Sequence, residues 1–112
     1  MTAPRLNRKL MLEAPQRVPD GSGGFLESWV ELGRIWAEVR ARPGREVRLG
    51  ASVVSRATHQ ITVRAAPFGA PSRPTPTHRF REGQRQFRIL SVTEADLSGR
   101  HLVCAAVEEI AA

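Results

Sequence analysis

The residues of this chain that could carry catalysis or hold a metal are few and scattered. His59, His78 and His101 stand far apart, and none has a cysteine or an acidic residue at the spacing that zinc ligands use. We expect three surface or strand-edge histidines and no metal site. Cys104, the only cysteine, lies in LVCAAV, a setting typical of a small buried hydrophobic residue rather than a reactive thiol. A single cysteine forms no internal disulfide, which favours a reducing compartment.

Two further motifs suggest chemistry at first sight. The segment Asp20-Gly21-Ser22-Gly23-Gly24 looks like a phosphate cradle, but no Gly-Lys-Ser/Thr follows it and no helix is expected to begin there. We therefore interpret it as a flexible hairpin or a loop that contacts a partner. Glu108-Glu109 is an acidic pair without a second catalytic group nearby in sequence. We find no active site, and we predict that the chain is not an enzyme and uses no cofactor.

Positive charge is the strongest compositional signal. The net charge is +6 with a pI near 11.4, and Lys9 is the only lysine among 17 basic residues. Such an excess of arginine suits contact with phosphates, although codon usage in a GC-rich genome would produce it equally well. Aromatic residues make up only 5% of the chain and tyrosine is absent, so base stacking has little support. Loose, salt-screened contact with a polyanion is the interpretation that remains.

Short runs of alternating apolar residues, separated by turn signals, predict strands and no strong helix. We expect Phe25–Glu31 to be irregular, with Trp29 as its anchor. Pro43-Gly44 predicts a turn, and four prolines between residues 67 and 76 predict a loop outside any sheet. The expected strands cover residues 8–13 (closed by Pro15), 32–42, 47–53, 59–65, 79–81, 86–93 and 100–108. Gly50 interrupts the segment 47–53, for which a short helical turn is the alternative.

These strands predict a single domain, residues 1–112, of mostly β class: a small antiparallel β-barrel or curled sheet with long flexible loops. The alternation is clearest after His59, where Ile61, Val63 and Ala65 are expected to face inward. We place Trp36 in the barrel core together with Ile61. No apolar run approaches the roughly 18 residues of a membrane helix, and the N-terminal residues show no secretory signal, so we expect assembly in the cytoplasm.

The order of several short motifs resembles the phage head–tail joining family, the head-closure or stopper proteins of long-tailed phages and of gene-transfer agents derived from them. The resemblance runs from Leu6 to Glu109 and departs from the family pattern where Ala65-Ala66 leads into a proline-rich insertion. The motifs are Trp29, Trp36-Ala37-Glu38-Val39, Gly44-Arg45-Glu46, Thr58-His59-Gln60-Ile61-Thr62-Val63-Arg64, the Gly83 turn, Phe87-Arg88-Ile89, Val92 and a closing strand from Leu102 to Glu108.

The resemblance implies a β-barrel that assembles as a ring, expected to be a hexamer, between the portal/adaptor ring of a capsid and the tail proteins. It also implies that the excursion from Arg42 to Arg56 points toward a channel filled with packaged double-stranded DNA. Arg42, Arg45 and Arg48 would then face DNA without reading its sequence; the alternative is a solvated loop that never meets DNA. Such a protein resides in the neck of a virion or phage-like particle, is assembled in the host cytoplasm and has no membrane partner.

We assign partner contacts to two loops. One contains Asp20, Gly21, Gly23 and Gly24, and the other contains Phe68 and Arg73. Three functional classes remain in comparison: a structural connector ring, a small basic β-barrel that binds nucleic acid as a free protein, and a small enzyme. The glycine- and proline-rich loops and the weak stacking chemistry favour the connector.

Overall fold

Six antiparallel strands close into a barrel. A computed structural model of the protein describes residues 3–49 and 52–109, with side chains for residues 3–42 and 58–109. The strands follow the order β1-β2-β3-β6-β5-β4 around the barrel, and pairing of β1 with β4 closes it. The predicted small antiparallel barrel is confirmed. The strands are β1 (Arg8–Pro19), β2 (Phe25–Leu49), β3 (Ser52–Arg64), β4 (Arg79–Glu82), β5 (Arg85–Glu94) and β6 (His101–Glu109).

The barrel core is built from alternate residues of each strand, because successive side chains of a strand point to opposite faces of the sheet. Ile61 and Val63 are fully buried, as their alternation predicts. Ala65 was predicted to continue the series, but β3 ends at Arg64 and Ala65 is exposed. The buried cluster consists of Leu10, Leu12, Ala37, Ile61, Val63, Phe80, Phe87, Ile89, Leu102, Cys104 and Ala106.

Strand β2 is far longer than the sequence suggested. The segment Phe25–Glu31, expected to be irregular, pairs with β1 as regular strand. Pro43-Gly44, expected to be a turn, lies inside β2, where the register with β3 shifts between Arg42 and Arg45. A β-bulge of this kind absorbs residues that would otherwise end a strand. The expected strand at 32–42 and the first part of that expected at 47–53 are therefore one element. Val53 belongs to the next strand, β3, and residues 50–51 lie outside the described residues.

Strand β1 also continues beyond its predicted end. Pro15, expected to close it, pairs with Trp29 of β2, and the strand runs to Pro19. Its pairing with β4 ends at Glu13, so the later residues have a sheet partner on one side only. A proline is tolerated on such an edge because no ladder hydrogen bond is lost there.

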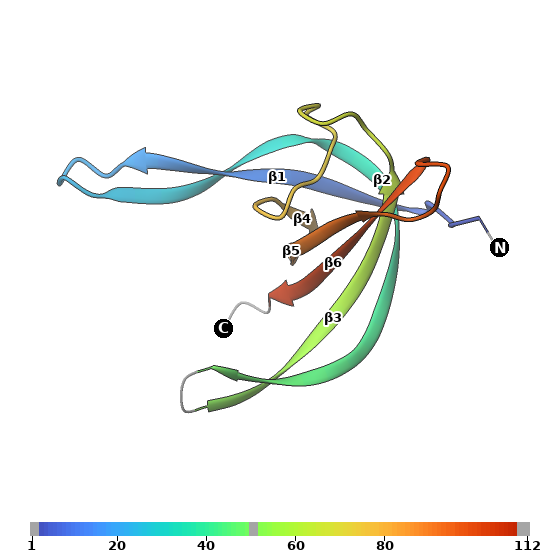
Figure 1. The fold of residues 1–112 in the computed structure, drawn as a ribbon. Helices are drawn as coiled ribbons and strands as arrows, with labels where there is room; N and C mark the ends of the chain where they lie inside the picture. The colour runs from blue at the N-terminus through green and yellow to red at the C-terminus, as the bar shows by residue number, and fades with distance from the viewer. Residues whose placement is uncertain (1–2, 50–51, 110–112) are drawn as a thin grey trace.

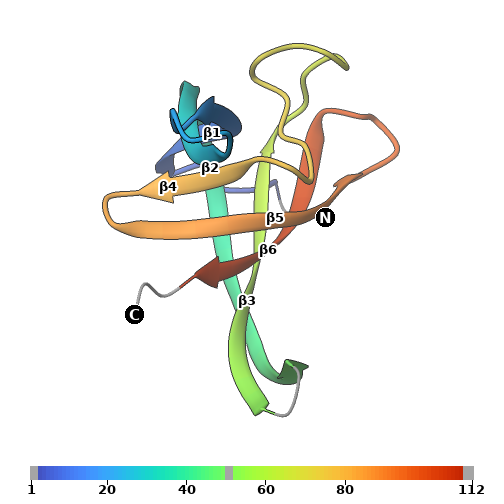
Figure 2. The same cartoon turned by 90° about the vertical axis from the view of Figure 1, so that its left-hand side faces the viewer.

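These extensions give the molecule two long hairpins that project from the barrel (Figures 1 and 2). One is formed by the end of β1 and the start of β2; the other by the end of β2 and the start of β3. The views show them leaving the barrel on the same side and diverging from one another. The proline-rich segment between β3 and β4 forms the predicted loop, and Pro74 within it is fully buried.

The predicted core position of Trp36 is wrong. Its side chain is 52% exposed, and the Lys9 ammonium lies 5.5 Å from the centre of its ring. Ile35 and Ala37, its neighbours in β2, pack toward the core, so alternation turns Trp36 outward. Ile61, the second residue placed in the core, is confirmed there.

Candidate functional site

The residues predicted to contact partners and DNA lie on three separate features rather than in one pocket. Asp20, Gly21, Gly23 and Gly24 occupy the tip of the β1–β2 hairpin, and Phe68 and Arg73 belong to the loop between β3 and β4. Arg42, Arg45 and Arg48 lie on the β2–β3 hairpin. The geometry therefore fits a molecule that makes several distinct surface contacts.

The tip of the β1–β2 hairpin is organised by Asp20. Its Oδ1 accepts hydrogen bonds from the backbone N–H groups of Ser22 (2.8 Å) and Gly24 (3.0 Å). Its own N–H donates to the Gly24 carbonyl at 3.1 Å. Gly21 and Gly23 have φ angles of +83° and +85°, which residues with a side chain rarely adopt. The sequence therefore specifies a closed tip whose shape is held by Asp20, and its contact with a partner stays a prediction.

Phe68 and Arg73 form a stacked pair on the loop between β3 and β4. The guanidinium carbon lies 3.8 Å from the centre of the Phe68 ring, and Nη1 donates to the Ala66 carbonyl at 2.8 Å. Phe68 nevertheless remains 86% exposed. Beneath the loop is an apolar groove of about 520 Å³, whose lining includes Ala14, Leu32 and Val92. An exposed aromatic residue beside an apolar groove is suited to protein contact.

The arginines assigned to DNA lie on the β2–β3 hairpin, which projects from the barrel (Figure 1). Arg42 is exposed and donates a hydrogen bond from Nη2 to the Gln60 side chain. The backbone of Arg45 pairs with Arg56 and that of Arg48 with Val53. The side chains of Arg45 and Arg48 lie outside the described residues. Their facing toward DNA stays a prediction.

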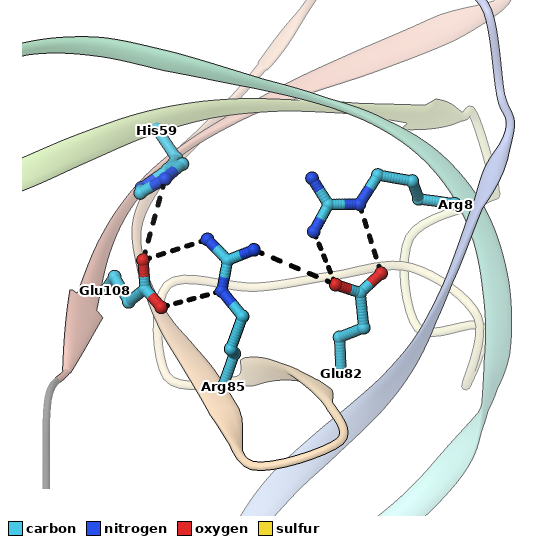
Figure 3. Close-up of polar contacts among 5 residues, drawn as sticks. All are labelled: Arg8, His59, Glu82, Arg85 and Glu108. Carbon is cyan, nitrogen blue, oxygen red and sulfur yellow. Dashed lines mark hydrogen bonds and ion pairs between the residues drawn. The ribbon is translucent and has the colours of Figure 1, made fainter.

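A charged layer closes one end of the barrel, and the sequence analysis missed it. Figure 3 shows Arg8, His59, Glu82, Arg85 and Glu108, which come from five strands. Arg85 donates to Glu108 from Nε (2.8 Å) and Nη2 (3.0 Å), and its Nη1 lies 4.0 Å from Glu82. Arg8 donates to both carboxylate oxygens of Glu82, from Nε at 3.1 Å and also from Nη2.

Extending the series of inward-facing residues by one more position in each strand would have located this layer. His59 precedes the buried Ile61 by two residues, Arg85 precedes Phe87 by two, and Glu108 follows Ala106 by two. Each charged residue thus continues an inward-facing series past its last apolar member. The layer is electrically balanced, with two arginines, two glutamates and one histidine.

His59 is the most deeply buried member of the layer, which corrects its predicted surface position. Only 6% of it is exposed, its ring meets Phe87 edge to face at 5.0 Å, and its Nε2 lies 3.7 Å from Glu108. Its Nδ1 is buried without a hydrogen-bond partner among the described residues. Burial lowers the pKa of His59, and the positive charges of Arg85 and Arg8 add to this effect against the opposing Glu108. His59 is therefore neutral near pH 7.

A second ion-pair cluster lies on the outside of the barrel. Glu13 is buried and accepts hydrogen bonds from Nε of Arg79 (2.7 Å) and Nε of Arg81 (3.0 Å). Burial by itself raises the pKa of Glu13, but the hydrogen bonds and charges of the two arginines outweigh it and lower that pKa. The Arg79 guanidinium also lies 4.0 Å from the centre of the Trp29 ring. These contacts fix the base of the β1–β2 hairpin to β4.

The described residues hold no group of three or more histidine, cysteine or acidic side chains that could bind a metal. Cys104 is buried as predicted, and burial raises the pKa of its thiol to about 12. Within the described part of the chain, no helix is long and apolar enough to cross a membrane.

The comparison with known families decides the class. The model of the family described as "Phage head completion protein" matches residues 1–109. The chain belongs to the phage head completion protein family. The chain is thus a structural component of a phage or phage-like particle, and the resemblance seen in its sequence motifs is confirmed.

A solved structure places the same fold in an assembled particle. The protein is 49% identical to a chain from the "Virion of native gene transfer agent (GTA) particle". The match covers 98% of this chain and 100% of that one, with a TM-score of 0.83. No curated protein matches the chain.

Proposed function

We propose that this protein forms a ring, built from six copies, between the portal/adaptor ring and the tail proteins. In this position it retains packaged DNA and later lets it pass. The observation that carries the proposal is the match over nearly the full length of both chains to a protein in a gene transfer agent virion. The role is structural and requires no catalytic group.

The shape of the molecule supports a connector. Its two hairpins extend well beyond the barrel, and the molecule measures 52 × 34 × 24 Å along its principal axes. A two-stranded hairpin without further packing is marginally stable by itself in water, so such extensions suit contacts with neighbouring subunits. The Asp20 tip and the Phe68–Arg73 pair then serve as contacts to the adaptor and the tail.

The placement in the neck is tested by reconstructing purified particles without imposed symmetry at the capsid vertex that bears the tail. The expected result is a ring of this barrel, in six copies, directly between the portal/adaptor complex and the first tail ring. Density for the chain in the capsid shell, or as a single copy, would refute the proposal.

We further propose that Arg42, Arg45 and Arg48 line the channel and hold DNA phosphates without reading bases. A six-fold ring would sum contacts that are individually weak and screened by salt. Replacement of all three by glutamate is expected to preserve the fold and particle closure while changing DNA retention or delivery. The matched control is the triple variant Arg5→Glu, Arg34→Glu, Arg100→Glu, which changes the charge equally at exposed residues outside the β2–β3 hairpin. Normal DNA content and delivery in the hairpin triple variant would leave a solvated hairpin as the explanation.

A further inference from the structure

The β1–β2 hairpin has one face without any charged residue. Residues directly opposite in an antiparallel pair share a face of the sheet, so the register of β1 and β2 defines this face. Val18, Leu26 and Val30 on it are 40%, 62% and 41% exposed. We call it the neutral arm face; it consists of Ala14, Gln16, Val18, Leu26, Ser28 and Val30.

The opposite face of the same hairpin carries charged and aromatic residues. It carries Arg17 opposite Glu27, and its two aromatic rings are covered by arginines of the same chain. The Arg17 guanidinium lies 4.6 Å from the centre of the Phe25 ring, and that of Arg79 lies 4.0 Å from the centre of the Trp29 ring. The protein thus partly covers one face by itself and leaves the aliphatic residues of the neutral arm face open.

A second uncharged surface lies on the outside of the barrel, over β3, β6 and β5. The register forms two rows across these strands: Thr62, Val103 and Thr93 in one, and Gln60, Ala105 and Ser91 in the other. Ala105, Ser91 and Thr93 are exposed. On the β2 side the rows continue into Glu38 and Arg40, which form an ion pair at 3.3 Å, and Arg42, Arg64 and Arg88 lie at the other margins. Thr62 is only 6% exposed. We call the exposed and half-buried part of this surface the β6 outer face; it consists of Gln60, Ser91, Thr93, Val103 and Ala105.

The strand order keeps the two surfaces apart within one molecule. In the ring β1-β2-β3-β6-β5-β4, β6 is three strands from β1 in either direction, so it forms the wall opposite β1. The hairpin leaves from the wall that contains β1, and Figure 2 shows it on the other side of the barrel axis from β6. Different patches on opposite walls produce a head-to-tail contact, which closes into a ring when the rotation between copies allows it.

We propose that the neutral arm face of one copy packs on the β6 outer face of the next copy. Two flat strand surfaces pack face to face in this way in β-sandwiches. Neither set of residues includes a charged side chain, and the charged residues that border the β6 outer face on β2 have partners of their own, Arg40 in Glu38 and Arg42 in Gln60. The contact therefore buries no arginine or glutamate without a partner, which would be costly. The inference rests on the proposed ring and specifies the contact that builds it.

Cysteine cross-linking in purified particles tests the contact. A Leu26→Cys, Ala105→Cys double variant places one thiol on each surface, while buried Cys104, with its pKa raised to about 12, stays unreactive. A short bis-maleimide is expected to produce a ladder of covalent oligomers in steps of the 12.4 kDa chain. Each single variant is expected to give no ladder. Particles that contain the double variant but yield no ladder would overturn the inference.

A pair of charge variants separates the two faces of the hairpin. Leu26 and Phe25 are adjacent and similarly exposed, at 62% and 57%, but they lie on opposite faces. Leu26→Asp is expected to leave the melting temperature unchanged and to reduce incorporation into particles at least ten-fold. Phe25→Asp, the matched control, is expected to be incorporated normally. Normal incorporation of Leu26→Asp, or equal loss in both variants, would contradict a contact through the neutral arm face.

Counting the copies of the chain in each particle by quantitative mass spectrometry distinguishes this inference from the proposed function. Several copies per particle without cross-links would refute the contact between the neutral arm face and the β6 outer face, but they would not contradict the proposed ring. A single copy per particle would refute the ring, and with it the contact between copies.

Discussion

The Arg85 guanidinium donates two hydrogen bonds to the Glu108 carboxylate, at 2.8 and 3.0 Å, and so joins the start of β5 to the end of β6. His59 approaches the same carboxylate from β3 at 3.7 Å. The pair therefore holds three strands together directly beside the apolar core. Loss of this pair is therefore expected to lower the stability of the barrel as a whole.

We predict that Glu108→Gln lowers the free energy of unfolding by about 1–2 kcal/mol, because a charge-assisted bidentate pair is lost; the figure is modest because the Arg85 side chain is 44% exposed. Urea denaturation measures the change. Glu109→Gln, at the exposed neighbouring position, is expected to stay within about 0.5 kcal/mol of the wild type. Equal effects of the two substitutions would mean that the pair does not stabilise the barrel.

The pH dependence of stability should report on His59. Its pKa in the folded protein lies below its ordinary value of 6.5, so the unfolded chain binds the proton more readily. The contribution of His59 to the free energy of unfolding is therefore fully present above about pH 6.5, and it is lost as the pH falls below that value. Glu13, Glu82 and Glu108 have lowered pKa values, so their contributions are lost only as the pH falls further, below the ordinary glutamate value of 4.5.

The measurement is the melting temperature between pH 7 and pH 5. We expect it to fall in the wild type and to fall less in His59→Gln. Burial also lowers the pKa of His78, so His78→Gln serves as the comparison and should remove a separate part of the slope. An unchanged slope in His59→Gln would show that His59 is not the group responsible.

Trp36 and Ile61 provide a matched test of the strand facing. Ile61→Ala is expected to cost about 2–5 kcal/mol, since it leaves a cavity in the fully buried core. Trp36→Ala is expected to cost less than about 1 kcal/mol, because the ring is half exposed and contacts Lys9. Thermal melting of both variants decides the matter. A larger loss of stability in Trp36→Ala than in Ile61→Ala would contradict the outward orientation of Trp36 in β2.

We predict that the isolated protein is monomeric or associates only weakly, and that it forms its ring on the adaptor. The β1–β2 hairpin beyond Glu13 pairs only with itself, so ordering it against a neighbour has an entropic cost. Sedimentation velocity at micromolar concentration measures the state. A stable closed ring in the absence of partners would disagree with this expectation.

Alternation predicted most of the barrel core but not the lengths of its strands. The inward positions of Ile61 and Val63 and the strands on either side of the Gly83 turn were predicted correctly, because the local sequence alternates clearly there. The extension of β2 through Pro43-Gly44 and of β1 through Pro15 escaped prediction, because both residues are tolerated only at a bulge or on an edge without a second neighbour. Those conditions depend on the strand order.

In the candidate site, too, the features set by local sequence could be predicted, whereas those that depend on several strands could not. The Asp20 tip is specified by its own residues, so it could be located from sequence. The layer formed by Arg8, His59, Glu82, Arg85 and Glu108 unites residues from five strands, and no local pattern pairs them. Trp36 was misplaced because its size suggested the core, whereas its position in the alternation placed it outside.

The most direct test of the central claim is the DNA content of particles made without this chain. We predict that a deletion of its gene yields capsids without tails that lose their packaged DNA, and that the wild-type gene restores tailed, DNA-filled particles. The measurement is nuclease-protected DNA per purified capsid, together with the fraction of capsids that carry a tail. Tailed capsids with normal protected DNA in the absence of the chain would contradict the account.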